Sequence, residues 1–226
     1  GKIIRHIYIK TYNLDRSFTD TRKSEHNPAV QIGNRLHVTT KKFVIRDNLF
    51  IQENTPLNAF KLADNERYIR SLEYIHDARI VVDTLPDNPD SVDLTVFTKD
   101  LFSIAGGAAS QALNHVNGNL YDANLAGLGQ RLEVTGLYDY NRHSNFGYGG
   151  SYRKSNLMHS FVDGTVGYSL MNGSYYTHEE ESTQYIAFSR QLVSPYSRFA
   201  GALTLSHNEA YNLYNLPENI VFKYKY

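Results

Sequence analysis

Histidine is the residue of this chain with the most chemistry to offer, because imidazole nitrogens bind metal ions. The nine histidines are scattered along the sequence, at His6, His26, His37, His76, His115, His143, His159, His178 and His207. No two of them have the H-x₃-H or H-E-x-x-H spacing that places ligands on one side of a helix. Cysteine is absent, which excludes thiolate metal sites, disulfides and a cysteine nucleophile. The sequence therefore predicts no metal site.

Two other patterns could carry enzyme chemistry. Residues 179–181 are three consecutive glutamates, and paired carboxylates serve glycosidases, but they stand between two predicted strands, which favours a solvated loop. The glycines at 106–107 and 127–129 lack the strand–turn–helix context of a phosphate-binding loop, and no G-x-S-x-G sequence is present. We therefore predict that the chain is not an enzyme and needs no cofactor.

Composition narrows the class of protein. The 23 Lys and Arg residues balance 23 Asp and Glu residues, so no basic surface predicts nucleic-acid binding. No stretch approaches the roughly 18 apolar residues of a transmembrane helix, so any crossing of a membrane must use strands. Tyrosine reaches 18 and glycine 15. Strands rich in these residues are typical of membrane barrels, whose aromatic rings lie near the lipid–water interfaces.

The first half of the chain predicts a small module in the order strand, helix, helix, strand, strand. Thr39 or Thr40 could cap the first helix and Asn58 caps the second. A turn at residues 85–90 joins the last two strands, and residues 14–33 form a long polar loop. The strands are expected at residues 2–13, 78–84 and 92–98, and the helices at 41–50 and 59–74.

From about residue 102 the sequence predicts only strands. Eight segments alternate, at residues 102–111, 117–129, 130–140, 146–155, 161–171, 183–193, 198–208 and 219–226. The apolar members of one face include Leu132, Val134, Tyr138, Val166 and Tyr168. Segments of about 10 residues with alternating apolar and polar positions are typical of a transmembrane β-barrel. A soluble antiparallel sandwich alternates just as well.

A resemblance to a known family separates these alternatives. The run IRDNLFIQENTPLNAFKLADNERYIRSLEYIHDARIVV, followed by VDLTVFTKDLFS, resembles a POTRA domain of the Omp85 superfamily of BamA-like outer-membrane proteins. The family pattern is an "IR..L.F..G" helix, an "ER.LR.L.YI.DARI.V" helix and strand, and a "D.VDV.V.T.D.FS" strand. This sequence departs from the pattern at Asn54, where the family usually has glycine, and in the long loop at 14–33.

The second half carries further resemblances. LYDANLAGLGQ at 120–130 is similar to the "DPNLLGLGQ" turn between early barrel strands of Omp85 proteins, and YRKSNL at 152–157 resembles a second such repeat. Ala123 and Ser155 stand where the family has proline. SRQLVSP at 189–195, with FAG at 199–201, resembles the "SRPFYSP…WAGG" element of relatives in the Bacteroidetes.

These resemblances imply a fold and its domains. We expect an α+β POTRA domain (β-α-α-β-β) at residues 1–101. All-β antiparallel strands of a partial transmembrane β-barrel would follow at residues 102–226. The family's barrel is longer than this chain can supply, so we expect an N-terminal fragment of it.

The resemblance also implies a function, namely assembly or insertion of proteins in the outer membrane, with residues 1–101 in the periplasm. By the topology of the family, strand 78–84 lies at a sheet edge and pairs with unfolded β-strands. The docking residues would be Ala78, Arg79, Ile80, Val81 and Val82. The incoming strand would pass to a weak barrel seam near 102–110 or 117–129, where Ala105, Gly106, Gly107 and Ala108 are small. The lipid-facing residues would be Leu132, Val134, Tyr138, Val166 and Tyr168.

The expected partners are outer-membrane lipid, unfolded outer-membrane proteins and accessory lipoproteins. An open piece of barrel exposes a large apolar face, so the fragment can also self-associate. Two alternatives stay open at this point. One is an Omp85-type secretion pore, as in two-partner secretion or in TamA-like proteins. The other is a soluble envelope β-protein that binds polysaccharide or peptide.

Overall fold

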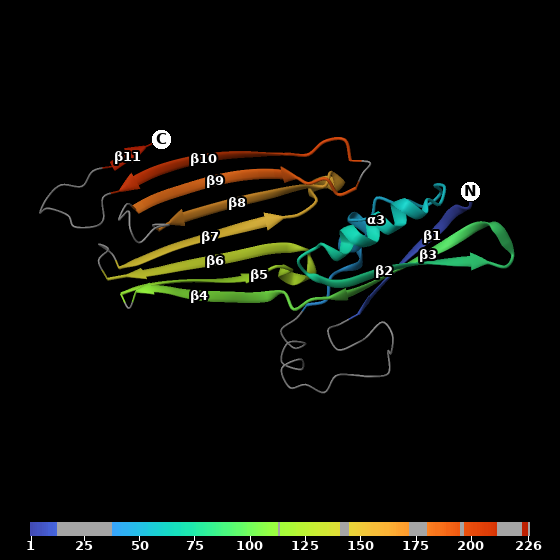
Figure 1. Ribbon diagram of the computed structural model, residues 1–226, viewed down its shortest axis with the longest axis horizontal. Helices are drawn as coiled ribbons and strands as arrows, with labels where there is room; N and C mark the ends of the chain where they lie inside the picture. The colour runs from blue at the N-terminus through green and yellow to red at the C-terminus, as the bar shows by residue number, and fades with distance from the viewer. Residues whose placement is uncertain are drawn as a thin grey trace, which may run out of the picture.

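The structure, a computed structural model, describes residues 1–12, 38–112, 114–140, 145–171, 180–194, 197–211 and 223–225. These residues form a three-stranded sheet with two helices, followed by an eight-stranded sheet. The first sheet and its helices, here called the N-terminal domain, lie at one end of the long strands of the second sheet (Figure 1). The loop predicted at 14–33 and Glu179 fall outside the described residues.

The N-terminal domain has the predicted order of elements. They are β1 (Ile3–Tyr12), α2 (Lys42–Asp47), α3 (Ala59–Arg70), β2 (Ile75–Leu85) and β3 (Asn88–Asp100). Strand β3 is central, because it pairs parallel with β1 and antiparallel with β2. Strand β2 therefore lies at an edge of the sheet, as predicted for residues 78–84.

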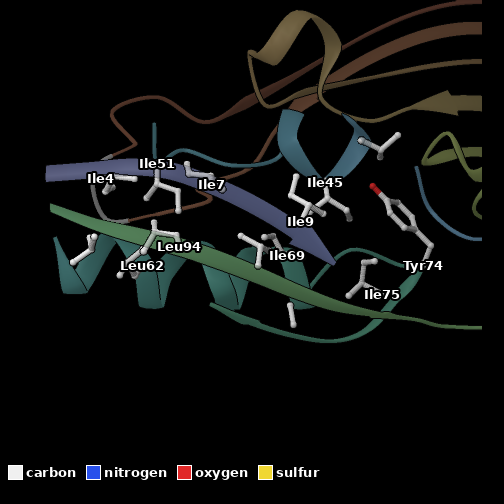
Figure 2. Close-up of a cluster of buried hydrophobic side chains, with 14 residues drawn as sticks. Ile4, Ile7, Ile9, Ile45, Ile51, Leu62, Ile69, Tyr74, Ile75 and Leu94 are labelled. Atoms are coloured by element: carbon white, nitrogen blue, oxygen red, sulfur yellow. The ribbon is translucent and has the colours of Figure 1, made fainter. Parts of the chain in front are cut away.

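One apolar core holds this domain together (Figure 2). Val92, Leu94 and Val96 of β3 are fully buried beneath the two helices, as their period of two requires. In β1 the register shifts between Ile4 and Ile7, which lets Ile4, Ile7 and Ile9 all face the core. Burial of each such side chain contributes about 1.5–3 kcal/mol.

Both helices are shorter than the sequence predicted. Helix α2 ends at Asp47 because the side chain of Asn48 turns back and donates to the carbonyl of Val44, at 2.8 Å. The predicted cap at Thr39 or Thr40 was wrong, since the cap residue is Lys41 and no side chain caps the helix. Asn58 caps α3 as predicted, and its side chain accepts from the amides of Phe60 and Lys61.

The second sheet contains the eight expected strands, arranged in chain order and antiparallel throughout. They are β4 (Ile104–Ala112), β5 (His115–Asp122), β6 (Gln130–Asp139), β7 (Phe146–Lys154), β8 (Val162–Leu170), β9 (Glu180–Arg190), β10 (Gly201–Tyr211) and β11 (Lys223–Lys225). Strands β4 and β11 lie at its two edges. In the described part of the chain this is one open sheet, and the two packed layers of a soluble sandwich are not formed. Glu180 and Glu181 belong to β9 and not to the loop predicted for them.

Within the described ranges, no helix is both long enough and apolar enough to cross a membrane.

Candidate functional site: strand edges, apolar face and domain junction

The β1 edge of the N-terminal sheet is closed by its own chain at residues 2–7. The amide of Ile4 donates to the carbonyl of Thr55 at 3.0 Å, and the amide of Asn54 donates to the carbonyl of Ile4 at 2.7 Å. Further along the strand, the amide of Ile7 donates to Glu53 Oε1 at 2.8 Å. Outward backbone groups that an added strand would need are therefore already occupied along residues 2–7 of this edge.

The β2 edge is closed only along its first half. The amide of Ile80 points outward and donates to Glu66 Oε2 of α3 at 2.9 Å, and the amide of Ala78 donates to Asp77 Oδ1 at 2.8 Å. Because amides alternate along a strand, those of Val82 and Thr84 also point outward. No residue in the described ranges pairs with these two amides, so the open part of the edge begins at Val82.

The occupied amides of β2 limit which of the predicted docking residues, Ala78–Val82, could pair with an added strand. Ala78 is buried and the amide of Ile80 is occupied, whereas Val82 is exposed. Arg79 and Val81 alternate with these residues and direct their amides towards β3. The role of the segment in docking stays a prediction, but the accessible backbone lies at Val82 and Thr84.

The predicted seam residues lie in an edge strand. Ala105, Gly106, Gly107 and Ala108 belong to β4, which pairs only with β5. The other location predicted for the seam, residues 117–129, includes β5, which is not an edge strand because it pairs with both β4 and β6. Gly106 is required sterically, since a Cβ there would lie 2.5 Å from the carbonyl oxygen of Asn119. Whether this edge opens to accept a strand stays a prediction.

The eight-stranded sheet has one apolar and one polar face. The pairs Leu132–Tyr152 and Tyr152–Val166 place the predicted lipid-facing residues of β6 and β8 on the same side. Exposed apolar side chains continue across this face, at Leu120, Leu132, Val134, Tyr138, Tyr148, Val166, Ile186, Phe188, Leu203 and Leu205. Soluble monomers rarely expose a contiguous apolar patch of this kind. Contact with lipid itself stays a prediction.

The opposite face carries a polar network at the end nearest the N-terminal domain. Glu133 accepts from Asn119 at 2.8 Å and pairs with Arg131 at 2.8 Å. The guanidinium of Arg131 also lies over the ring of Tyr121, at 3.7 Å from its centre. Charged and amide groups on this face would suit a water-filled interior and not lipid.

Two turns of the second sheet connect it to the N-terminal domain. The first, residues 123–129, is here called the Asn124 turn. The side chain of Asn124 accepts from the amide of Gly129 at 2.7 Å and donates to Thr40 Oγ1 at 2.8 Å. The amide of Lys41 donates to the carbonyl of Gly127 at 3.0 Å. This turn therefore holds the start of helix α2.

The Asn156 turn, residues 155–161, holds the other end of the same helix. The side chain of Asn156 accepts from the amide of Phe161 at 2.8 Å and donates to the carbonyl of Asp47 at 2.6 Å. His159 Nε2 lies 2.8 Å from Asp47 Oδ1. The ring of Phe161 packs edge-on against Tyr68 at 5.5 Å between ring centres.

Glu73 links the strands that flank both turns. Its carboxylate pairs with Arg131 of β6 at 3.2 Å and with Arg153 of β7 at 2.6 Å. Burial by itself raises the pKa of Glu73, but the hydrogen bonds and charges of Arg153 and Arg131 outweigh it and hold that pKa below its usual range. Burial also raises the pKa of the Tyr68 phenol, which stays protonated and donates to Asn48 Oδ1 at 3.0 Å.

Sequence reasoning missed Asn124, Asn156 and Glu73 as the residues of this junction. The available signal was the repeated Asn-Leu pair in the two turn motifs, which marked turns but not their contact with α2. The histidines form no metal centre in the ranges described, where no three His, Cys, Asp or Glu side chains gather. His115 is instead buried beside Asp139, with Nδ1 at 2.9 Å from Oδ2.

Comparison with known proteins shows the fold. No protein-family model matches this chain, and no curated protein gives a significant match. The crystal structure of BamA from Haemophilus ducreyi lacking POTRA domains 1-3 is similar, with a TM-score of 0.55 and 13% identity over 93% of this chain and 36% of that one. CdiB from Acinetobacter baumannii is similar with a TM-score of 0.52 and 13% identity, over 98% of this chain and 38% of that one.

These two likenesses show the fold alone: the chain folds like a part of the BamA and CdiB structures, with its second sheet open in the described residues. It spans little more than a third of the length of each neighbour. The identities are too low to carry function from the neighbours to this chain. The POTRA assignment and the kinship with proteins of the Bacteroidetes stay predictions.

Proposed function

We propose that this chain is the junction of an Omp85-type assembly factor of the outer membrane. Residues 1–101 act as a periplasmic POTRA domain, and residues 102–226 are strands of its membrane barrel. The order β-α-α-β-β, the motifs of the first half and the Omp85-like fold support this assignment. The exposed apolar face of the second sheet supports a place in lipid.

The observation that carries the proposal is the open stretch of backbone at the β2 edge of the N-terminal sheet. The segment at residues 53–57 covers residues 2–7 of the β1 edge, whereas β2 offers outward amides at Val82 and Thr84. An open strand edge binds an extended chain through backbone hydrogen bonds, which require no particular side chains. That property suits a protein that receives many different unfolded outer-membrane proteins.

Transfer of the captured strand would follow the chain itself. Only three residues separate the end of β3 at Asp100 from the start of β4 at Ile104. Strand β4 is the edge strand of the barrel sheet and carries small side chains at Ala105 and Ala108. A strand released from β2 would find a second open edge at β4. Accessory lipoproteins, if they bind, would need surfaces of the domain other than the β2 edge.

The test is to block the β2 edge without breaking the sheet. Proline at position 82 removes an amide that points away from β3, so Val82→Pro should leave the β2–β3 ladder intact. Val82→Thr is the matched control, because it keeps both the amide and the shape of the side chain. Binding of an extended peptide from an unfolded outer-membrane protein would be measured by hydrogen exchange at residues 82–85 in the detergent-solubilised chain.

We expect the peptide to protect residues 82–85 in the parent and in Val82→Thr, and not in Val82→Pro. Equal binding by Val82→Pro and the parent would refute capture at this edge. A secretion pore of the same superfamily would not require strand capture at β2. Absence of any peptide protection in the parent would therefore favour that alternative.

A further inference from the structure

A cavity lies at the border between the N-terminal domain and the apolar face. Its volume is about 360 Å³, within the range of roughly 300–1,000 Å³ that small-molecule sites occupy. It opens between the start of α3, the Asn156 turn, the end of β9 with residues 193–194, and residues 197–199. The side chains that define its chemistry are Lys61, Arg190, Arg198, Phe50, Phe161 and Phe199.

The charge of this cavity is one-sided. Three cationic side chains line it, and no acidic side chain does so among the described residues. Arg190 is partly buried, its Nε is shielded from solvent, and that atom has no hydrogen-bond partner in the described part of the chain. A buried guanidinium nitrogen without an acceptor is costly, so a ligand that supplies an anionic oxygen would remove that cost.

The position of Arg190 identifies the ligand more closely. It pairs with Val162 in β8 and lies two residues beyond Phe188, so both side chains are on the apolar face of the sheet. Phe188 and its neighbour Leu203 are exposed there. The cavity therefore joins an apolar surface, suited to acyl chains, to cations at the end of the sheet nearest the N-terminal domain.

We propose that this cavity binds the phosphate of an anionic membrane phospholipid, whose acyl chains lie along Phe188 and Leu203. The aromatic rings of Phe161 and Phe199 form the apolar wall below the headgroup. The bound lipid would fill the space between α3 and the barrel strands and so join the domain to the membrane surface. This inference rests on the membrane location proposed above but not on strand capture at β2.

The test adds short-chain phosphatidylglycerol or phosphatidylcholine to the detergent-solubilised full chain and counts bound lipid by native mass spectrometry. We expect phosphatidylglycerol to bind in preference to phosphatidylcholine. Arg190→Gln and Arg198→Gln should each weaken that binding about fivefold, the effect of one cation at an anionic lipid surface. The control is Lys154→Gln, which removes an exposed cation at the same end of the apolar face but outside the cavity.

Each other outcome overturns a stated part of the inference. Equal weakening by Lys154→Gln would mean general attraction of headgroups and not a site. Full competition by inorganic phosphate would mean an anion site that ignores the acyl chains. No preference between the two lipids, in a chain that still associates with vesicles and still binds peptide at β2, would overturn the lipid site and leave the proposed function intact.

Discussion

The two turns that hold helix α2 share three left-handed backbone positions but carry different side chains at them. In the Asn124 turn the left-handed positions are Ala126, Gly127 and Gly129, with φ of 55°, 73° and 62°. In the Asn156 turn the matching residues are Met158, His159 and Phe161, with φ of 51°, 60° and 58°. In each turn the Asn side chain accepts an amide from the last of these positions.

The difference shows two ways to join a domain to a sheet. The Asn124 turn lies against the domain backbone, so that a Cβ on Gly127 would be 2.5 Å from the carbonyl oxygen of Thr39. The Asn156 turn reaches the domain with the side chains of Asn156, His159 and Phe161. A left-handed residue with a side chain costs about 1–2 kcal/mol. The contacts of Phe161 with Phe50 and Tyr68 offset that cost, at about 0.5–1.5 kcal/mol for each aromatic pair.

The largest effect is expected where the Asn124 turn approaches the domain. Gly127→Ala combines the left-handed cost with a clash against backbone, so we expect a loss of at least about 2 kcal/mol in unfolding free energy. Urea unfolding in detergent measures the loss, and hydrogen exchange at the Lys41 amide reports whether the turn separates from α2. The control is Gly136→Ala, where a Cβ meets nothing within 4 Å, and its effect should stay within about 0.5 kcal/mol.

The second prediction separates the two ends of α2. Thr40→Val removes the hydroxyl that accepts from Asn124 and leaves a buried amide unpaired, which should cost about 1–3 kcal/mol. Asp47→Ala removes only the exposed carboxylate near His159, because the Asn156 side chain bonds to the backbone carbonyl of residue 47. We expect it to cost less than about 0.5 kcal/mol by the same urea measurement. A larger loss in Asp47→Ala than in Thr40→Val would contradict the assigned hydrogen bonds.

The sequence predicts those features of the fold that depend on neighbouring residues, and it misses contacts between residues far apart in the chain. Alternation identified the strands and the shared face of Leu132 and Val166, because a period of two is a property of the strand itself. The edge position of β2 came from the family topology, and the element order agreed with it. The hydrogen bond from Asn124 to Thr40 could not be predicted, because the two residues are 84 positions apart in the chain. Thr39 and Thr40 also both fitted the pattern of a cap for α2. The hydrogen bond from the Ile80 amide to Glu66 was also missed, because Glu66 fits the solvated face of a helix equally well.

A smaller effect is expected at Glu73, which spans the strands beside both turns. Since its pKa in the folded chain lies below the usual 4.5, its pairs stabilise the fold above that pH and are lost as the pH falls below it. Glu73 is partly exposed, so Glu73→Gln should cost no more than about 1 kcal/mol at neutral pH. The deficit relative to the parent should shrink on acidification, as measured by urea midpoints along a pH series. A deficit that is independent of pH would show that the carboxylate charge does not join the domains.

The smallest effect is expected from making the second turn resemble the first. His159→Gly removes the cost of a left-handed backbone at a residue with a side chain, about 1 kcal/mol. It also removes the exposed ion pair with Asp47, which stabilises the fold by less than that. We therefore expect no loss of stability, or a gain of a few tenths of a kcal/mol, in urea unfolding. His159→Ala is the control, because it gives up the pair but keeps a side chain in the left-handed position, and it should be the less stable of the two variants.

If both variants lost stability equally, the pair with Asp47 and not the backbone would set the energy of this turn. The Asn156 turn would then hold α2 through its side chains alone, whereas the Asn124 turn depends on close contact between backbones.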